Sequence, residues 1–111
     1  MSSKFCCIVP AYNEEKRIGE VIAGVREAIP DIIVVDDGSQ DATAAFAEQA
    51  GAYVIRHGQN CGKGMALRTG FSHALKQGYD AVMTVDGDGH HAPSEIADFL
   101  AAFTSGRGDI I

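Results

Sequence analysis

The segment FCCIVPAYNE, residues 5–14, decides the fold of this chain. Its first part, Phe5–Val9, is a continuous apolar run, which is typical of a strand buried on both faces of a parallel sheet. Its second part, Pro10–Glu14, contains turn-forming, polar and acidic residues. The segment therefore predicts an interior strand that opens into a polar loop at its carboxyl end.

Three further apolar runs end in the same way. The strand-like runs are Ile32–Val35, Ala52–Arg56 and Ala81–Val85, and the polar segments that follow them are Asp36–Ser39, Asn60–Gly64 and Asp86–His91. Stretches with helical periodicity lie between the runs, so strands and helices alternate along the chain. This alternation predicts an α/β fold of the Rossmann-like kind, a mostly parallel open sheet with helices on both faces.

Four helices are expected. The first is capped by Asn13, has acidic residues in its first turn and ends at Pro30. Ser39 or Asp41 caps the second, the third spans residues 63–77, and the fourth begins near Pro93. The predicted buried faces of the first three are Ile18, Val21, Ile22, Val25 and Ile29; Ala42, Ala45, Phe46 and Ala50; and Leu67, Phe71, Ala74 and Leu75.

Right-handed crossovers between parallel strands predict the strand order 3-2-1-4. In such sheets ligands collect beyond the carboxyl ends of the strands, where the strand order reverses. Here the reversal lies between the first and fourth strands, so residues 11–14 are expected next to residues 86–90. Asp36 and Asp37 are expected one strand away.

The composition fits one soluble domain, residues 1–111. The net charge of −6 argues against a nucleic-acid partner, because phosphate backbones require clustered Lys and Arg. Three cysteines without metal-type spacing predict reduced thiols and a cytoplasmic location. Gly106 and Gly108 break the chain before Asp109–Ile111, which resembles the start of a fifth strand. We therefore expect a domain truncated at its C-terminus, with an exposed sheet edge through which two copies form a homodimer.

Asp86 and Asp88 are the candidate metal ligands and catalytic residues. They flank Gly87, whose missing side chain lets a substrate approach the backbone. Carboxylate oxygens select Mg²⁺ or Mn²⁺, and such a cation neutralises charge on a departing nucleoside diphosphate. His90 is a third candidate metal ligand, and its nitrogen favours manganese. The competing interpretation is a turn rich in Gly and Asp, with solvated carboxylates.

Asp36 and Asp37 follow the second strand directly. Two adjacent acids are costly to hold together unless a cationic or hydrogen-bonding partner is near. We expect Asp37 to organise the loop and Asp36 to contact the nucleoside. The alternative is an Asx-type turn with Gly38, followed by a helix cap from Ser39.

The segment Asn60–Gly64 opens the third helix, so its backbone N–H groups can face an anion. It is not a P-loop, because that motif needs four residues between its glycines and a Ser or Thr after the Lys. Lys63 either offsets pyrophosphate charge or is a solvated lysine at a flexible turn.

Three residues after the first strand have two interpretations each. Tyr12 either stacks on a nucleobase or packs at the mouth of the cleft. Asn13 and Glu14 either bind the substrate or simply start a helix, as a cap and a first-turn acid. His57 and His73 are predicted to be ordinary surface or rim residues.

Together these segments resemble the N-terminal half of a family 2 glycosyltransferase, close to the dolichyl- or polyprenyl-phosphate sugar transferases. The matching segments are Val9–Glu14, Val35–Asp41, Asn60–Gly64 and Val85–Pro93, in the same order as in that family. The resemblance implies a GT-A fold, a UDP- or GDP-sugar donor, and Mg²⁺ or Mn²⁺ at the D-x-D motif formed by Asp86 and Asp88. The residue two positions after this motif is usually Gln in the lipid-phosphate branch, and here it is His90.

The resemblance also implies roles for the other strand ends. Base and ribose are held by the acid pair and by the residues after the first strand. In this chain those residues are Pro10, Ala11, Tyr12, Asn13 and Glu14. The implied reaction is a one-step displacement with inversion, and one implied acceptor is a lipid phosphate. Family members place the acceptor site, and a catalytic base where one exists, beyond the matched segment, so we expect nucleotide binding with little or no transfer.

Three other classes of protein compete with this interpretation. The first is a nucleotide-sugar-binding module without catalysis. The second is a receiver-type signalling domain, whose acidic pair, however, follows the first strand and not the second. The third is a nucleotidyltransferase, which needs a Gly-rich loop where Ala11–Asn13 stands.

Overall fold

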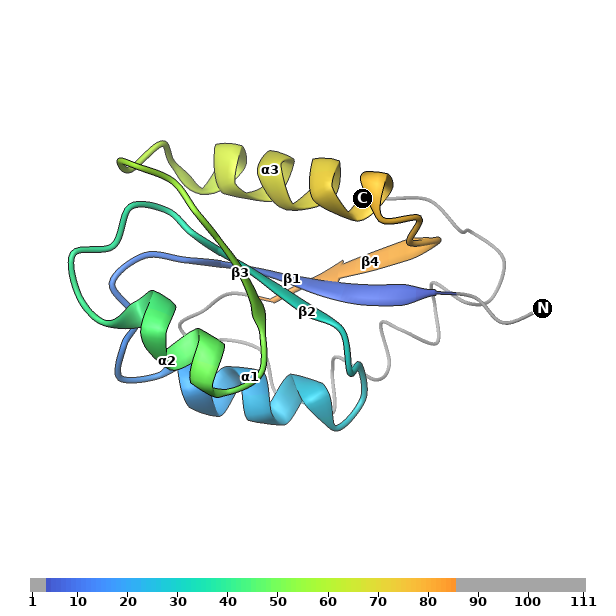
Figure 1. The fold of residues 1–111 in the computed structure, drawn as a ribbon, viewed down its shortest axis with the longest axis horizontal. Helices are drawn as coiled ribbons and strands as arrows, with labels where there is room; N and C mark the ends of the chain where they lie inside the picture. The colour runs from blue at the N-terminus through green and yellow to red at the C-terminus, as the bar shows by residue number, and fades with distance from the viewer. Residues whose placement is uncertain (1–3, 86–111) are drawn as a thin grey trace.

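The computed structural model describes residues 4–85 as one parallel four-stranded sheet in the order β3-β2-β1-β4 (Figure 1). The strands are β1 (Phe5–Ala11), β2 (Ile32–Asp36), β3 (Tyr53–Arg56) and β4 (Ala81–Thr84). This topology confirms the predicted fold class and strand order. It differs from the 2-1-3-4-5 order of receiver domains and so argues against that interpretation.

Helices cover both faces of the sheet. Helices α1 (Ile18–Arg26) and α2 (Thr43–Gln49) lie on one face, and α3 (Lys63–Lys76) lies on the other (Figure 1). Among residues 4–85, no helix has both the length and the apolar character that a bilayer crossing requires. The predicted helix from Pro93, the fifth strand at Asp109–Ile111 and the homodimer through that strand lie outside the described residues.

The strand β1 is buried on both faces, as its apolar run predicts. Cys7 and Val9 pack with α1 on one side, whereas Cys6 and Ile8 pack with α3 on the other. Burial raises the pKa of Cys6 and of Cys7 to about 12, so both are protonated thiols at neutral pH. The strand extends two residues beyond the predicted end, to Ala11.

The start of α1 differs from the prediction. Asn13 has a φ of 53°, in the left-handed region, so it does not lead directly into a helix. The helix begins at Ile18 and ends at Arg26, before Pro30. The predicted apolar stripe is confirmed nevertheless: Ile18, Ile22, Val25 and Ile29 are buried, and Val21 packs against them.

The predicted buried face of α2 is wrong in part: Ala50 packs against the core, but the two central residues do not. Thr43, Ala44 and Ala47 are buried, whereas Ala45 is exposed and Phe46 is 40% exposed. The reason lies in Thr43, whose hydroxyl hydrogen-bonds to the backbone of the β1 loop and to a carboxylate of its own loop. These polar contacts fix the rotation of the helix, and periodicity alone does not register them.

The predicted face of α3 is also partly wrong. Its buried residues are Ala66, Gly70 and Ala74, spaced four apart, and Leu75 is 63% exposed. A Cβ placed on Gly70 would lie 2.5 Å from Cγ2 of Ile8, so the helix approaches β1 too closely for a larger side chain. The bulky residues Leu67 and Phe71 are displaced to the sides of this contact, where they are half-buried.

Candidate functional site

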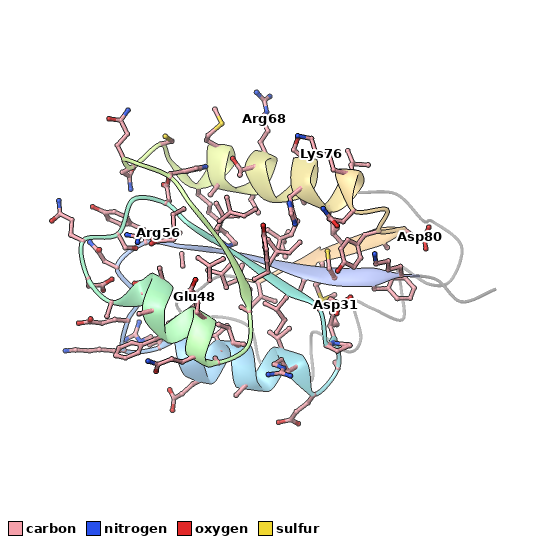
Figure 2. The ribbon with its side chains drawn as sticks, viewed as in Figure 1. Asp31, Glu48, Arg56, Arg68, Lys76 and Asp80 are labelled. Atoms are coloured by element: carbon pink, nitrogen blue, oxygen red, sulfur yellow. The ribbon has the colours of Figure 1, made fainter. Side chains whose placement is uncertain are left out.

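The carboxyl ends of β1, β2 and β4 meet at one edge of the sheet. The N–H of Asp37 donates to the carbonyl of Ala11 at 2.8 Å, and the N–H of Val85 donates to the carbonyl of Ile8 at 3.1 Å. Strand β1 therefore lies between β2 and β4, at the point where the strand order reverses. Figure 2 shows Arg56 toward this edge, and Asp31 and Asp80 toward the opposite one.

The loops after β1 and β2 bind each other through side chains. The N–H of Asn13 donates to Oγ of Ser39 at 2.8 Å, and the N–H of Gln40 donates to Oδ1 of Asn13 at 2.9 Å. Asn13 is therefore not the cap of a helix, as one interpretation held, and Ser39 does not cap α2. Each residue instead satisfies the backbone of the opposite loop.

A second reciprocal set of bonds lies farther along the same two loops. The N–H of Glu15 donates to Oδ2 of Asp41 at 3.3 Å, and the N–H of Ala42 donates to Oε1 of Glu15 at 3.0 Å. The N–H of Glu14 donates to Oγ1 of Thr43 at 2.8 Å. Glu14 and Glu15 therefore bind the loop after β2, and both residues precede the start of α1.

Asp41 is the acid that serves the start of α2. Its Oδ1 accepts the N–H of Thr43 at 3.0 Å and also accepts the Thr43 hydroxyl. Burial raises the pKa of this carboxyl, but hydrogen bonds from Thr43 and from the Glu15 backbone outweigh burial and hold the pKa below its usual range. Of the two predicted caps, Asp41 is the one that the structure supports.

Asp36 ends β2 and is only 1% exposed. Its Oδ1 accepts the N–H of Ser39 at 3.0 Å, and its Oδ2 lies 3.5 Å from Nε of Arg56 at the end of β3. The carboxylate therefore closes the turn after β2 and neutralises a charge from the neighbouring strand. The predicted contact between Asp36 and a nucleoside stays a prediction.

Asp37 holds the loop that follows β3, in agreement with the predicted role of loop organiser. Its Oδ1 accepts the N–H of Cys61, and its Oδ2 accepts the N–H of Gly62, both at 2.8 Å. Its Oδ1 also lies 2.8 Å from Nδ1 of His57. Burial raises the pKa of Asp37, but the hydrogen bonds from His57, Cys61 and Gly62 lower it by more than burial raises it. The pKa of Asp37 therefore lies below the usual range.

His57 is a residue of this site that the sequence interpretation missed. Its side chain is 14% exposed, and both ring nitrogens are engaged: Nδ1 by Asp37 and Nε2 by Oγ1 of Thr69 at 2.9 Å. A signal was present, because His57 directly follows β3, the strand paired with β2, and β2 ends beside Asp37. A polar residue at the end of one strand lies beside a polar residue at the end of its neighbour.

The loop after β3 rests directly on Gly38. Gly38 has a φ of 77°, and a Cβ there would lie 2.5 Å from the backbone nitrogen of Asn60 and 2.5 Å from the carbonyl carbon of Gln59. Only glycine accepts both that conformation and that approach. Gly62, with a φ of 97°, then turns the chain into α3, where Lys63 is the first and an exposed residue.

Asp37, His57 and Cys61 also form a group whose possible ligand atoms lie within 4.8 Å of one another. Both carboxylate oxygens of Asp37 are already bonded to backbone N–H groups, and both ring nitrogens of His57 have partners. This pattern is that of a hydrogen-bonded loop anchor, and we assign the group no metal.

The remaining predicted site residues differ in exposure. The side chains of Pro10 and Ala11 are buried within β1, paired with Val35 and Asp36, so they are strand residues and not loop residues as predicted. Tyr12, the next residue, is 44% exposed at the edge. Asp86, Gly87, Asp88 and His90 lie outside the described residues, directly after Val85.

The opposite edge of the sheet carries a separate cavity of about 290 Å³. Its lining includes Asp31, Tyr53, His73 and Tyr79. The rings of Tyr53 and His73 stack with centroids 4.8 Å apart. This cavity lies at the amino ends of β2 and β3, so it is distinct from the edge where the strand-end loops meet.

Comparison with known proteins gives a consistent result. The family model described as Glycosyl transferase family 2 matches residues 6–111. The chain is 36% identical over 107 residues to the polyprenol monophosphomannose synthase of Mycolicibacterium smegmatis, a match that covers 89% of this chain and 40% of that protein. It is 38% identical over 111 residues to the UDP-N-acetylglucosamine–dolichyl-phosphate N-acetylglucosaminyltransferase of Methanococcus voltae, covering 84% of this chain and 44% of that protein.

Solved structures show the same fold. Glucosyl-3-phosphoglycerate synthase from Mycobacterium tuberculosis, crystallised with Mn²⁺, UDP and glucosyl-3-phosphoglycerate, superposes with a TM-score of 0.78 at 26% identity. The match covers 96% of this chain and 41% of that one. The chain thus spans less than half the length of these relatives.

Proposed function

The chain belongs to glycosyltransferase family 2, and on this premise we propose that it forms the donor-binding part of an enzyme that transfers a sugar from a nucleoside diphosphate. The observation that supports this proposal most strongly is the convergence of three polar segments, those after β1, β2 and β3, at one sheet edge. The loops after β1 and β2 are bonded to each other, and Asp37 bonds the loop after β3. On the other side of β1, the N–H of Val85, the last described residue, donates to the carbonyl of Ile8.

The donor is a UDP- or GDP-linked sugar. The M. tuberculosis relative of known structure was crystallised with UDP and Mn²⁺, and in another crystal with UDP and Mg²⁺. In this chain the exposed ring of Tyr12 and the buried carboxylate of Asp36 lie at the edge where the base and ribose are proposed to bind. Helix α3 begins at Lys63, directly after Gly62, which is bonded to Asp37, and the charge of Lys63 and the amino end of the helix favour the negative charge of a diphosphate.

The residues proposed to hold Mg²⁺ or Mn²⁺ are Asp86, Asp88 and His90. Two carboxylates are the donor set that these cations prefer, and the N–H of Val85, one residue earlier, is bonded to β1 at the reversal point. A cation held there would act as a Lewis acid toward the leaving diphosphate. The proposed role of the bonded strand-end loops is to hold the donor in one orientation for a displacement with inversion.

The acceptor is proposed to be a lipid phosphate, because two of the relatives are named for polyprenol or dolichyl phosphate products or substrates. The runner-up is a nucleotide-sugar-binding part that transfers no sugar on its own. It is supported by the relatives' length, since this chain spans 40% and 44% of two of them. The cytoplasmic location stays a prediction.

Isothermal titration of the chain with UDP, GDP and their sugars, with and without Mn²⁺, tests the proposal. We expect binding of one nucleotide that is strengthened by Mn²⁺, and loss of that strengthening in the Asp86→Asn, Asp88→Asn double variant. Asp80→Asn, at the opposite edge, is the matched control and should bind as the parent does. Absence of heat with every ligand would refute donor binding, and efficient transfer by these 111 residues alone would refute the runner-up.

A further inference from the structure

His57 connects two elements that flank the strand-end edge. Its backbone N–H donates to the carbonyl of Asp36 at 2.9 Å, which continues the β2–β3 ladder by one bond. Its ring then bridges Asp37, at the end of β2, and Thr69, within α3. The imidazole is thus fixed at both nitrogens between the sheet and the helix.

The hydrogen-bond pattern defines the tautomer of this ring. An ionised carboxylate only accepts hydrogen bonds, so Nδ1 of His57 is the nitrogen that carries a proton toward Asp37. In the neutral ring, Nε2 then accepts the hydroxyl proton of Thr69. With both nitrogens engaged inside the protein, the ring is not placed to exchange protons with a substrate.

Asp37 transmits the position of this ring to the next loop. The same Oδ1 that receives His57 also receives the N–H of Cys61, and Oδ2 receives the N–H of Gly62. A carboxylate can accept hydrogen bonds from two successive N–H groups only in a narrow range of orientations. The bond from His57 holds the Asp37 carboxylate within that range. Lys63 and the start of α3 follow directly, so their position depends on that orientation.

We propose that His57 is a positioning residue for donor binding: through Asp37 it holds the turn at Asn60–Gly64, and thereby Lys63 and the amino end of α3, in the arrangement that receives the diphosphate. The proposal rests on the proposed function. The titratable groups that lie close to the ring are Asp37 and Cys61. Besides the ring, Oδ1 of Asp37 accepts the backbone N–H of Cys61.

Two variants of His57 separate the bond to Asp37 from the bond to Thr69. His57→Asn places a side-chain N–H the same number of bonds from the backbone as Nδ1, but it is too short to reach Thr69. His57→Ala removes both bonds. We expect His57→Ala to weaken binding of UDP or GDP in the presence of Mn²⁺ about tenfold, equivalent to about 1.4 kcal/mol, and His57→Asn to restore most of it.

Two matched controls distinguish positioning from a general loss of stability. His73→Ala removes a histidine from the other end of α3, where it stacks on Tyr53. Val25→Ala removes buried methyl groups from the opposite face of the sheet and lowers the melting temperature without touching the loop. Both should bind nucleotide as the parent does, even where Val25→Ala is less stable than His57→Ala.

Amide hydrogen exchange provides a readout that does not require a ligand. We expect the amides of Cys61 and Gly62 to exchange faster in His57→Ala than in the parent, and at nearly the parental rate in His57→Asn. Unchanged affinity in His57→Ala, or equal losses in His57→Ala and His57→Asn, would overturn the proposal. A parent that binds no nucleotide would refute the proposed function, and unchanged exchange in His57→Ala would separately refute the control of the loop by His57.

Discussion

Replacing Gly38 by Ala is expected to destabilise the fold by about 3 kcal/mol or more, because two separate costs combine. The φ of 77° at this position is unfavourable for any residue with a Cβ. The added Cβ would also lie 2.5 Å from backbone atoms of Gln59 and Asn60. Backbone atoms cannot rotate away as a flexible side chain does, so the loop after β3 would have to move off the sheet.

Gly58→Ala is the control for this prediction. Gly58 lies in the same loop, has no atoms within 4 Å of an added Cβ and has no positive φ. Urea unfolding should show a stability within about 0.5 kcal/mol of the parent for Gly58→Ala and a large loss for Gly38→Ala. Equal stability of the two variants would contradict the close contact between Gly38 and the loop.

Replacing Asp37 by Asn is expected to cost about 3 kcal/mol at neutral pH, the upper part of the range for hydrogen bonds to a buried charged group. Both carboxylate oxygens accept N–H groups, so either orientation of the amide would place its NH₂ against a donor. His57 would lose its charged partner as well. We also expect donor affinity to fall, because the turn before Lys63 would lose its anchor.

The pH dependence of this effect has a defined sign. Because the pKa of Asp37 is lowered in the folded state, its contribution to stability is present above the usual carboxyl pKa of about 4 and is lost as the pH falls through the folded-state value. The difference in stability between the parent and Asp37→Asn should therefore shrink as the pH falls below about 4. Chemical unfolding from pH 7 to pH 3 measures it, and a constant difference would contradict an ionised Asp37 as the anchor. Asp41, whose pKa is also lowered, is unchanged in both proteins.

The sequence predicted the sheet more reliably than the orientation of its helices. Continuous apolar runs such as Phe5–Val9 define buried parallel strands, and the right-handed crossover rule then gave the observed order. The buried faces of α2 and α3 were predicted from the helical spacing of apolar residues. They are determined instead by small residues that allow close approach, as at Gly70, and by the hydrogen bonds of Thr43.

The candidate site shows the same distinction. Strand-end position was sufficient to predict that residues after β1 and β2 lie together, and that Asp37 organises a loop. The bonds between the two loops, and the ring of His57, depend on which side chain faces which backbone N–H across about 25 residues of sequence, as the separations of 24 and 26 for two of these bonds show. A single sequence does not contain that pairing in any local pattern.

Paramagnetic line broadening by Mn²⁺ tests the central claim most directly, namely that a cation and a nucleoside diphosphate meet at the carboxyl edge of this sheet. With nucleotide present and Mg²⁺ as the diamagnetic reference, amide resonances of Tyr12, Ser39 and Val85 should broaden strongly. Those of Asp31, Tyr53 and Tyr79, at the opposite edge, should keep their widths. Broadening centred on the opposite edge, or spread evenly over both, would contradict the claim.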